Sequence, residues 1–364
     1  CIYGDGPEAS PYLYHGEGDY RGVKLMTGAD GTAVNQPPAL AADDLCRTVH
    51  GTAIIGDPRN DENRIISQLQ LAMIRFHNNV AQHLHDTEGL EGGELFEHAR
   101  EVATWHYQWV VIHDFLVHMC GAAVVDDVLG RGRRYYCANN GQPYIPVEFS
   151  VAAYRFGHSM IPQNIQIQQG DNARALFGTV LGAGFKPLEN ANGVVDWNEL
   201  VETSAGQNVQ RAEKLDSKMA SILLALPFIP ADSERSLANR NLLRGQTFRL
   251  PSGEAVAEYL GRPATEIEQV SDKAQDLAGS IDLSAGTPLW FYLLVEAEQI
   301  GRETTPGDTD NGEGLGPAGA RIVAETLIGL VELDSRSFLG SNRNWTPADG
   351  VGVSTLGEML TYMP

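Results

Sequence analysis

Apolar residues recur at intervals of three and four along much of this chain, which is the spacing of one face of an α-helix. The first such stretch covers residues 62–85 and the second 94–119, and a shorter helix is expected over 147–160, between Pro146 and Pro162. Further helical patterns cover 208–226, 252–260, 265–278, 288–300 and 318–330. Strand-like alternation is scarce. The pattern therefore predicts a mainly α protein.

Two segments depart from this pattern. Residues 1–61 are rich in Gly, Pro, Asp and Asn without a sustained period, which predicts an irregular, loop-rich lead-in. Residues 302–314 are polar, acidic and rich in glycine, which predicts a flexible surface loop. The chain contains no internal repeat. We expect residues 1–364 to form a single large helical domain with little β structure.

Charge narrows the range of partners. Lys and Arg number 26 against 47 Asp and Glu, a formal net charge of −21 that repels nucleic acid and anionic membranes alike. The longest uncharged apolar stretches, 219–231 and 283–295, are shorter than the roughly 18–20 residues that span a bilayer. We therefore expect no nucleic-acid partner and no transmembrane segment. The opening residues show no signal-peptide pattern, which leaves the compartment open.

The four cysteines form no C-x-x-C motif, so free or buried thiols are expected, with a Cys120–Cys137 bridge as the alternative. The ten histidines include no H-E-x-x-H, and His83, His85 and Asp86 lack the spacing that places two zinc ligands on one helix face. G-x-S-x-G and Walker motifs are also absent. These absences exclude the commonest zinc, serine-hydrolase and nucleotide-binding sites.

One histidine has a distinctive setting. His158 lies in the apolar stretch YRFGHSMIP, directly after Gly157, where the missing side chain leaves room for a planar group. A histidine on a helix is how peroxidases and globins hold haem iron. Taken alone, His158 is better interpreted as a hydrogen-bonded core residue, so the interpretation depends on other motifs.

Two further motifs supply candidate polar groups. In GDPRNDEN, Arg59 and Glu62 are three residues apart at the start of the first helix and can share a face. The alternative is a capping cluster with Asn60 or Asp61 as the N-cap. In SLANRNLLRGQTFRLP, Asn241 and Arg244 are also three apart. Alternatively, Asn241 is a turn former and Arg244 is a surface charge.

Together these motifs resemble the animal-type haem peroxidase superfamily, which includes myeloperoxidase, peroxidasin, bacterial relatives and, more distantly, the cyclooxygenases. The resemblance covers nearly all of the chain, and it is specific because five separated motifs occur in the family's order. These are IYGDGPE, GDPRNDEN with LQLAMIRFHNNVA, HYQWVVIHDFL, FSVAAYRFGHSMIP and RNLLRG. The later TPLWFYLLVEAE and LGPAGARIVAETLIGL resemble the carboxy-terminal helices of the bacterial branch.

The resemblance implies roles for particular residues and a haem b cofactor. His158 would be the axial ligand of the haem iron, and its other ring N–H would donate to the carbonyl oxygen of Asn241, fixing the tautomer. Arg155 and Arg244 would neutralise the two haem propionates. Arg59 would be the distal arginine that polarises bound peroxide.

Covalent attachment and calcium follow from the same resemblance. Glu62 matches a glutamate that forms an ester with a haem methyl group in several members. Asn63 stands where the family's mammalian enzyme has methionine, so no sulfonium link between the chain and haem is expected. Calcium is a candidate cofactor, although most of the family's calcium loop lies upstream of IYGDGPE.

The family's distal histidine and second ester-forming aspartate also lie upstream of that motif, and no Q-x-x-D-H-D pattern occurs in the sequence. Three explanations for the lack of a distal histidine stand: a cleaved precursor that leaves an N-terminal companion polypeptide, an incomplete chain, or a degenerate relative.

Arg155 occupies the position of the cyclooxygenase radical tyrosine, with Tyr154 one residue away, which disfavours fatty-acid oxygenation.

The expected function is therefore that of a haem peroxidase. It would reduce hydrogen peroxide and oxidise small organic electron donors or halides. The alternatives are a non-catalytic haem-binding or interaction protein of the same fold and, third, a fatty-acid dioxygenase. The resemblance favours an extracellular location.

Overall fold

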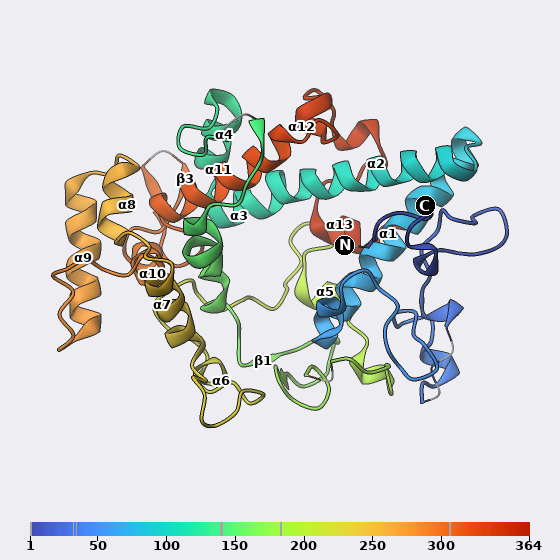
Figure 1. Cartoon of the computed structure of the whole chain (residues 1–364), viewed down its shortest axis with the longest axis horizontal. Helices are drawn as coiled ribbons and strands as arrows, with labels where there is room; N and C mark the ends of the chain where they lie inside the picture. The colour runs from blue at the N-terminus through green and yellow to red at the C-terminus, as the bar shows by residue number, and fades with distance from the viewer. Residues whose placement is uncertain (1, 32, 34, 139–140, 183, 306) are drawn as a thin grey trace. The chain divides into compact units, whose positions relative to one another are not determined.

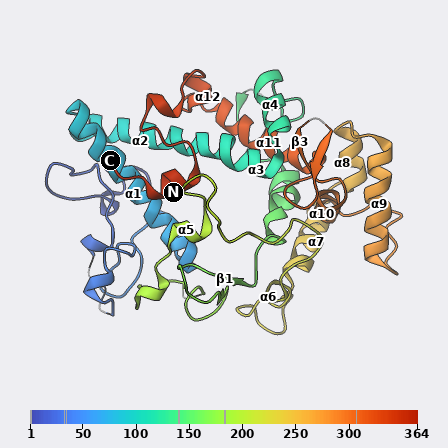
Figure 2. The same ribbon diagram turned by 180° about the vertical axis from the view of Figure 1, so that it is seen from behind.

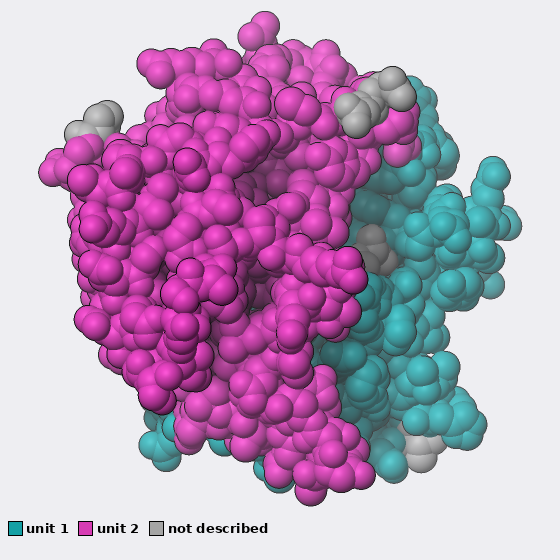
Figure 3. Space-filling view, turned by 60° about the vertical axis from the view of Figure 1, so that its left-hand side comes forward, with its two compact units in different colours: residues 1–110, 164–211, 345–364 teal, residues 111–163, 212–344 magenta. Residues whose placement is uncertain are grey.

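A computed structural model describes residues 2–31, 33, 35–138, 141–182, 184–305 and 307–364 of the chain. The chain divides into two compact units, each described by itself. Unit 1 comprises residues 1–110, 164–211 and 345–364, and unit 2 comprises 111–163 and 212–344 (Figure 3). Helices make up most of the regular secondary structure (Figures 1 and 2), which confirms the mainly α fold class.

Unit 1 is organised around two long helices, α1 (Arg64–Glu88) and α2 (Gly92–Val110), which pack against each other. The short helix α13 (Leu356–Thr361) also packs on α1. Their apolar faces bury a shared core, as the three-and-four spacing predicts. Outside the lead-in, the other regular elements of unit 1 are short: η9 (Ala191–Gly193), α5 (Trp197–Leu200), η10 (Pro347–Asp349) and the antiparallel pair β1 (Asn164–Ile165) and β2 (Arg174–Ala175).

The start of α1 differs from the expected one. The Asn63 side chain accepts a hydrogen bond from the Ile65 N–H at 2.9 Å, so Asn63 is the N-cap and the helix begins at Arg64. The expected caps Asn60 and Asp61 lie instead in the 3₁₀ helix η4 (Pro58–Asp61). Asp61 cannot cap α1 because its carboxylate binds the buried guanidinium of Arg47.

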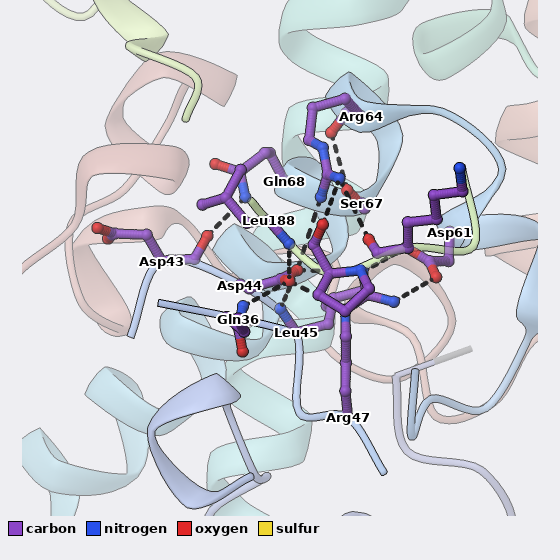
Figure 4. A network of polar contacts seen from close by, with 12 residues as sticks. Gln36, Asp43, Asp44, Leu45, Arg47, Asp61, Arg64, Ser67, Gln68 and Leu188 are labelled. Carbon is purple, nitrogen blue, oxygen red and sulfur yellow. Dashed lines mark hydrogen bonds and ion pairs between the residues drawn. The ribbon is translucent and has the colours of Figure 1, made fainter. Parts of the chain in front are cut away.

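The lead-in of unit 1 contains short 3₁₀ helices and isolated bridges rather than long elements. Besides η4, the helices are η1 (Pro11–Leu13), η2 (Gly28–Asp30) and η3 (Pro38–Leu40). Polar contacts around Arg47 join distant parts of this segment (Figure 4). Arg47 binds Asp44 and Asp61, and Asp44 also accepts from the Leu188 N–H at 2.6 Å. Buried ion pairs thus order backbone that lacks a helical period.

Unit 2 is built on two apolar helices, α10 (Leu289–Gln299) and α11 (Pro317–Leu333), which pack against each other. Both begin beside a proline, which favours a helix start: Pro288 precedes α10, and Pro317 is the first residue of α11. The surrounding helices are α3 (Leu116–Cys120), α4 (Ala122–Arg131), α6 (Ser221–Leu224), α7 (Leu237–Thr247), α8 (Gly253–Tyr259), α9 (Ala264–Ala278) and α12 (Phe338–Ser341).

Two expected helices contain other helical forms. The stretch 94–119 is not one α-helix, because the π-helix η5 (Val111–Phe115) separates α2 from α3. The stretch 147–160 is a π-helix, η7 (Glu148–Ala152), followed by a 3₁₀ helix, η8 (Ala153–His158). Apolar spacing indicates a helical face but does not distinguish these forms.

One further expectation is wrong, and another segment is more regular than expected. Most of 208–226 is not helical, and only α6 forms there. Backbone hydrogen bonds to distant segments, from Glu213 N–H to Met160 O and from Leu215 N–H to Gly312 O, replace the helical ones. The segment 302–314, expected as a flexible surface loop, contains the antiparallel strands β3 (Arg302–Thr305) and β4 (Asp308–Asp310), and β4 is exposed.

The thiols of Cys46, Cys120 and Cys137 are free, so the alternative Cys120–Cys137 bridge does not form. Within the described ranges, no helix combines the length and apolar character needed to cross a bilayer.

Candidate functional site

The 3₁₀ helix η8 of unit 2 places Arg155 and His158 on the same face. A 3₁₀ helix has about three residues per turn, so side chains three apart lie one above the other. The Trp290 indole N–H of α10 donates to the Arg155 carbonyl oxygen at 3.3 Å, which fixes η8 against the core of the unit. Both side chains therefore project from an anchored turn.

Helix α7 supplies the second set of polar groups. The hydroxyl of Ser236 accepts from the Asn239 N–H at 3.3 Å and begins the helix. Asn241 is the buried residue of α7, with 1% of its surface exposed. Arg240 and Arg244 are four residues apart, so the two guanidiniums lie along one side of the helix next to Asn241.

Three of these residues form a hydrogen-bonded chain. Arg155 Nη1 donates to Asn241 Oδ1 at 3.3 Å, and Asn241 Nδ2 lies 2.9 Å from His158 Nδ1. Arg155 Nε also donates to the Ser150 carbonyl oxygen at 3.1 Å. The structure thus brings His158 and Asn241 together, but through the amide nitrogen. The expected donation from the ring to the amide oxygen is not present, because that oxygen faces Arg155.

A cavity of about 450 Å³ opens beside this chain in unit 2. Its lining residues are Arg155, Leu237, Arg240, Asn241, Leu243, Arg244, Thr247 and Phe248. We call it the arginine cavity. Among the described residues, neither Arg155 nor Arg244 forms an ion pair with a carboxylate. Burial, with a contribution from Arg244, lowers the pKa of Arg155. Neighbouring unpaired guanidiniums favour an anionic ligand.

Sequence reasoning missed Arg240. Its position one residue before Asn241 and four before Arg244 was the available signal, because residues 237, 240, 241, 244 and 248 repeat at steps of three and four. Its Nε donates to the Glu234 carbonyl oxygen at 2.8 Å.

His158 is a neutral imidazole at neutral pH. Burial, followed by the charge of Arg155, lowers its pKa to about 4. The hydrogen bonds of the ring to described residues involve Nδ1 only, so Nε2 has no partner there. A Cβ built on the adjacent Gly157 would meet no described atom within 4 Å. A neutral ring can bind a metal through Nε2 when its proton is on Nδ1.

Arg59 and Glu62 belong to unit 1, whereas the His158 cluster belongs to unit 2. Arg59 is exposed and binds the Asp57 carboxylate, with Nη2 2.6 Å from Oδ2. This hydrogen bond raises the pKa of Arg59. Glu62 is exposed at the end of η4.

Two other histidines have structural roles. His77 is fully buried, with Nδ1 3.1 Å from the Tyr3 hydroxyl and Nε2 3.0 Å from the Val23 carbonyl oxygen. His106 lies between the Val353 carbonyl oxygen and the Val351 N–H.

Across the described part of the chain, no group of three or more His, Cys, Asp or Glu side chains could hold a metal ion. A metal held by a single histidine needs other ligands, as in a porphyrin.

The sequence profile of the animal haem peroxidase family matches residues 2–281 of this chain. The chain belongs to that family. Its members are haem peroxidases, and the match spans the motifs that contain His158 and Asn241.

Curated relatives are distant in sequence. Chorion peroxidase of Drosophila melanogaster is 27% identical over 244 residues, and eosinophil peroxidase of Mus musculus is 25% identical over 284 residues. These matches cover 64% and 72% of this chain but only 30% and 38% of the relatives. The chain therefore spans less than half the length of either relative.

Solved structures share the fold. Peroxidase A from Dictyostelium discoideum matches with a TM-score of 0.66 at 18% identity, covering 100% of this chain and 69% of that one. A fatty acid alpha-dioxygenase from Oryza sativa matches with a TM-score of 0.58 at 17% identity, covering 98% and 59%. One fold thus serves both kinds of enzyme.

Proposed function

We propose that this chain binds haem b and acts as a haem-dependent peroxidase that reduces hydrogen peroxide and oxidises small organic donors or halides. The observation that carries the proposal is the neutral imidazole of His158, whose Nε2 has no hydrogen-bond partner among the described residues and whose neighbour Gly157 leaves room for a planar group. The arginine cavity next to it suits the two carboxylates of haem. When bound, haem supplies the iron and the redox chemistry for peroxide reduction.

In this proposal the residues of unit 2 bind and orient the cofactor. His158 holds the iron through Nε2, and Asn241 fixes the ring through Nδ1. Arg155 and Arg244 neutralise the carboxylates, which would otherwise be costly to bury. Their guanidiniums suit this task because neither is bound to a carboxylate of the described chain.

Arg59 is proposed to stabilise negative charge on the bound peroxide, which requires its guanidinium to leave Asp57. Glu62 is a candidate for an ester bond to haem because its carboxylate is exposed. Proton transfer between the peroxide oxygens also requires a base, which none of the residues assigned above supplies. An extracellular location is part of this proposal and rests on the family resemblance.

His158→Ala tests the axial ligand. The purified chain reconstituted with haem should show a Soret band that the variant weakens or loses, because the ring nitrogen that holds iron is gone. His98→Ala is the control, since His98 is a half-exposed residue of α2 in unit 1. An unchanged Soret band in His158→Ala would contradict the proposed function.

Turnover distinguishes the proposal from its alternatives. A non-catalytic haem-binding protein would bind haem without oxidising guaiacol or iodide in the presence of peroxide, even after a segment that carries the family's distal histidine is added. A fatty-acid dioxygenase would convert linoleate to an oxygenated product, which product analysis would detect. Likeness of fold alone does not favour that third function.

A further inference from the structure

The guanidinium of Arg155 determines which way the buried Asn241 amide points. A guanidinium only donates hydrogen bonds, so the amide atom 3.3 Å from Arg155 Nη1 must be the oxygen. The amide nitrogen then faces His158 Nδ1 at 2.9 Å. Because that nitrogen donates, Nδ1 accepts, and the single proton of the neutral ring is on Nε2.

This tautomer cannot bind a metal through Nε2, because the lone pair of a neutral imidazole is on its unprotonated nitrogen. For Nε2 to bind iron, the proton must be on Nδ1, and Asn241 must turn its oxygen toward the ring. That turn would point the amide nitrogen at the Arg155 guanidinium, placing two donors against each other. Arg155 must therefore release Asn241 first.

An anion bound in the arginine cavity would explain why Arg155 releases Asn241. Arg155 lines it together with Arg240 and Arg244, and Arg155 has no carboxylate partner among the described residues. An anionic acceptor makes a stronger hydrogen bond to a guanidinium than a neutral amide does. The Ser150 carbonyl oxygen holds Nε, so Nη1 can exchange partners while the side chain stays in place.

We propose that Arg155 is a positioning residue that couples capture of a carboxylate in the arginine cavity to the tautomer of His158. The inference rests on the proposed function, and it adds an order of events. Arg155 binds a carboxylate, the Asn241 amide turns, water accepts the proton from Nε2, and Nδ1 takes a proton from water. The net charge of the ring is unchanged, and only then is Nε2 a ligand.

The first test compares two porphyrins with the same iron and the same ring. Ferric protoporphyrin IX carries two carboxylates, whereas its dimethyl ester carries none. Each is bound to the full chain at saturation and reduced, and the iron–histidine stretch is measured by resonance Raman spectroscopy. Protoporphyrin IX should give the stretch, and the dimethyl ester should lose it. Equal iron–histidine signals from both would overturn the inference.

Two variants of cavity residues separate positioning from charge. Arg155→Met removes the donor that holds the Asn241 oxygen, so the dimethyl ester should regain the iron–histidine stretch. Arg244→Met removes a charge from the same cavity, but its side chain has no hydrogen bond to Asn241 among the described contacts, so the ester complex should stay without the stretch. Identical behaviour of the two variants would overturn the inference. Circular dichroism checks that both are folded.

A measurement without porphyrin tests the inference even if the dimethyl ester binds neither the wild type nor the variants. In the ¹⁵N-histidine spectrum of the apo chain, the His158 signals are assigned by their loss in His158→Ala. The unprotonated nitrogen should be Nδ1 in the wild type, and a population protonated at Nδ1 should appear in Arg155→Met. A protonated Nδ1 in the wild type would overturn the inference.

Failure of the proposed function gives a different result. In that case protoporphyrin IX itself would show no iron–histidine stretch that depends on His158, and the inference would fail with it. If protoporphyrin IX shows the stretch and the ester shows it equally, the proposed function stands and the coupling through Arg155 is rejected.

Discussion

Arg47 illustrates how much one buried side chain determines at the residue scale. Its Nη1 and Nη2 each lie 2.7 Å from an oxygen of Asp61, and its Nε lies 2.9 Å from Asp44 (Figure 4). Burial alone would lower the pKa of Arg47, but the hydrogen bonds to Asp61 and Asp44 raise it above its usual value. Each charge in this group is tolerated only because its partners are present.

Asp61→Ala should therefore destabilise the chain strongly. Removal of one partner of a buried ion pair costs roughly 3 kcal/mol or more, because a charge is left without compensation. Asp43→Ala is the matched control, since Asp43 makes an exposed ion pair with Arg75 at 3.2 Å. Such pairs contribute about 1 kcal/mol or less. Urea unfolding should give a clearly lower midpoint for Asp61→Ala only, and similar midpoints would contradict this account.

Glu296 makes the stability of unit 2 depend on pH. Its carboxylate is 2% exposed and accepts the Ala318 and Gly319 N–H groups at 2.9 and 3.1 Å. Burial raises its pKa from 4.5 to about 7 in spite of these bonds. The stability linked to its protonated form is complete below pH 4.5 and is lost as the pH rises through 7, by roughly 3 kcal/mol.

Glu296→Gln should remove this dependence, because an amide does not ionise in that range. The free energy of unfolding of the variant should fall less than that of the wild type between about pH 5 and pH 8. Denaturant titrations at several pH values measure this difference. Parallel curves for the two proteins would show that Glu296 is not the group responsible.

At the scale of elements, the packing of α8 on α10 depends on a missing side chain. A Cβ on Gly253, the first residue of α8, would overlap the ring of Tyr292 in α10. Tyr292 is 1% exposed, so its ring has no room to move away. The sequence shows a glycine at the start of a helix, but only the tertiary contact gives the reason for it.

Gly253→Ala and Gly130→Ala should accordingly have opposite effects on stability. Overpacking at 253 should cost roughly 1–3 kcal/mol or more. At position 130, in α4, a Cβ meets no described atom within 4 Å, and replacing a helical glycine by alanine stabilises by up to about 1 kcal/mol. Thermal unfolding of the two variants checks the signs, and destabilisation by both would contradict this explanation.

At the scale of the whole molecule, the net charge of −21 should bias the choice of electron donor. An excess of negative charge attracts cations over distances that salt screens. With an active preparation, kcat/KM for a cationic aromatic amine should fall at least about twofold as salt rises from about 10 to 300 mM. The neutral donor guaiacol should show little change. Equal salt dependence for both donors would exclude steering by net charge.

The sequence by itself determined the helical class and most long helices, because a repeated apolar face is a local property that survives in any tertiary context. Helices α8, α9, α10 and α11 agree with the expected ranges to within three residues. It also determined the family, since the motifs around His158 and Asn241 are continuous stretches of chain. Those two residues could be paired in advance only through the resemblance.

The tertiary structure decided the features that depend on contacts distant in sequence. The failed helix over 208–226 and the strands β3 and β4 follow from backbone partners that no local period reveals. The orientation of the Asn241 amide depends on Arg155, which lies 86 residues away along the chain. A hydrogen bond of this kind is set by which donor arrives at the acceptor, and only the folded chain brings the donor there.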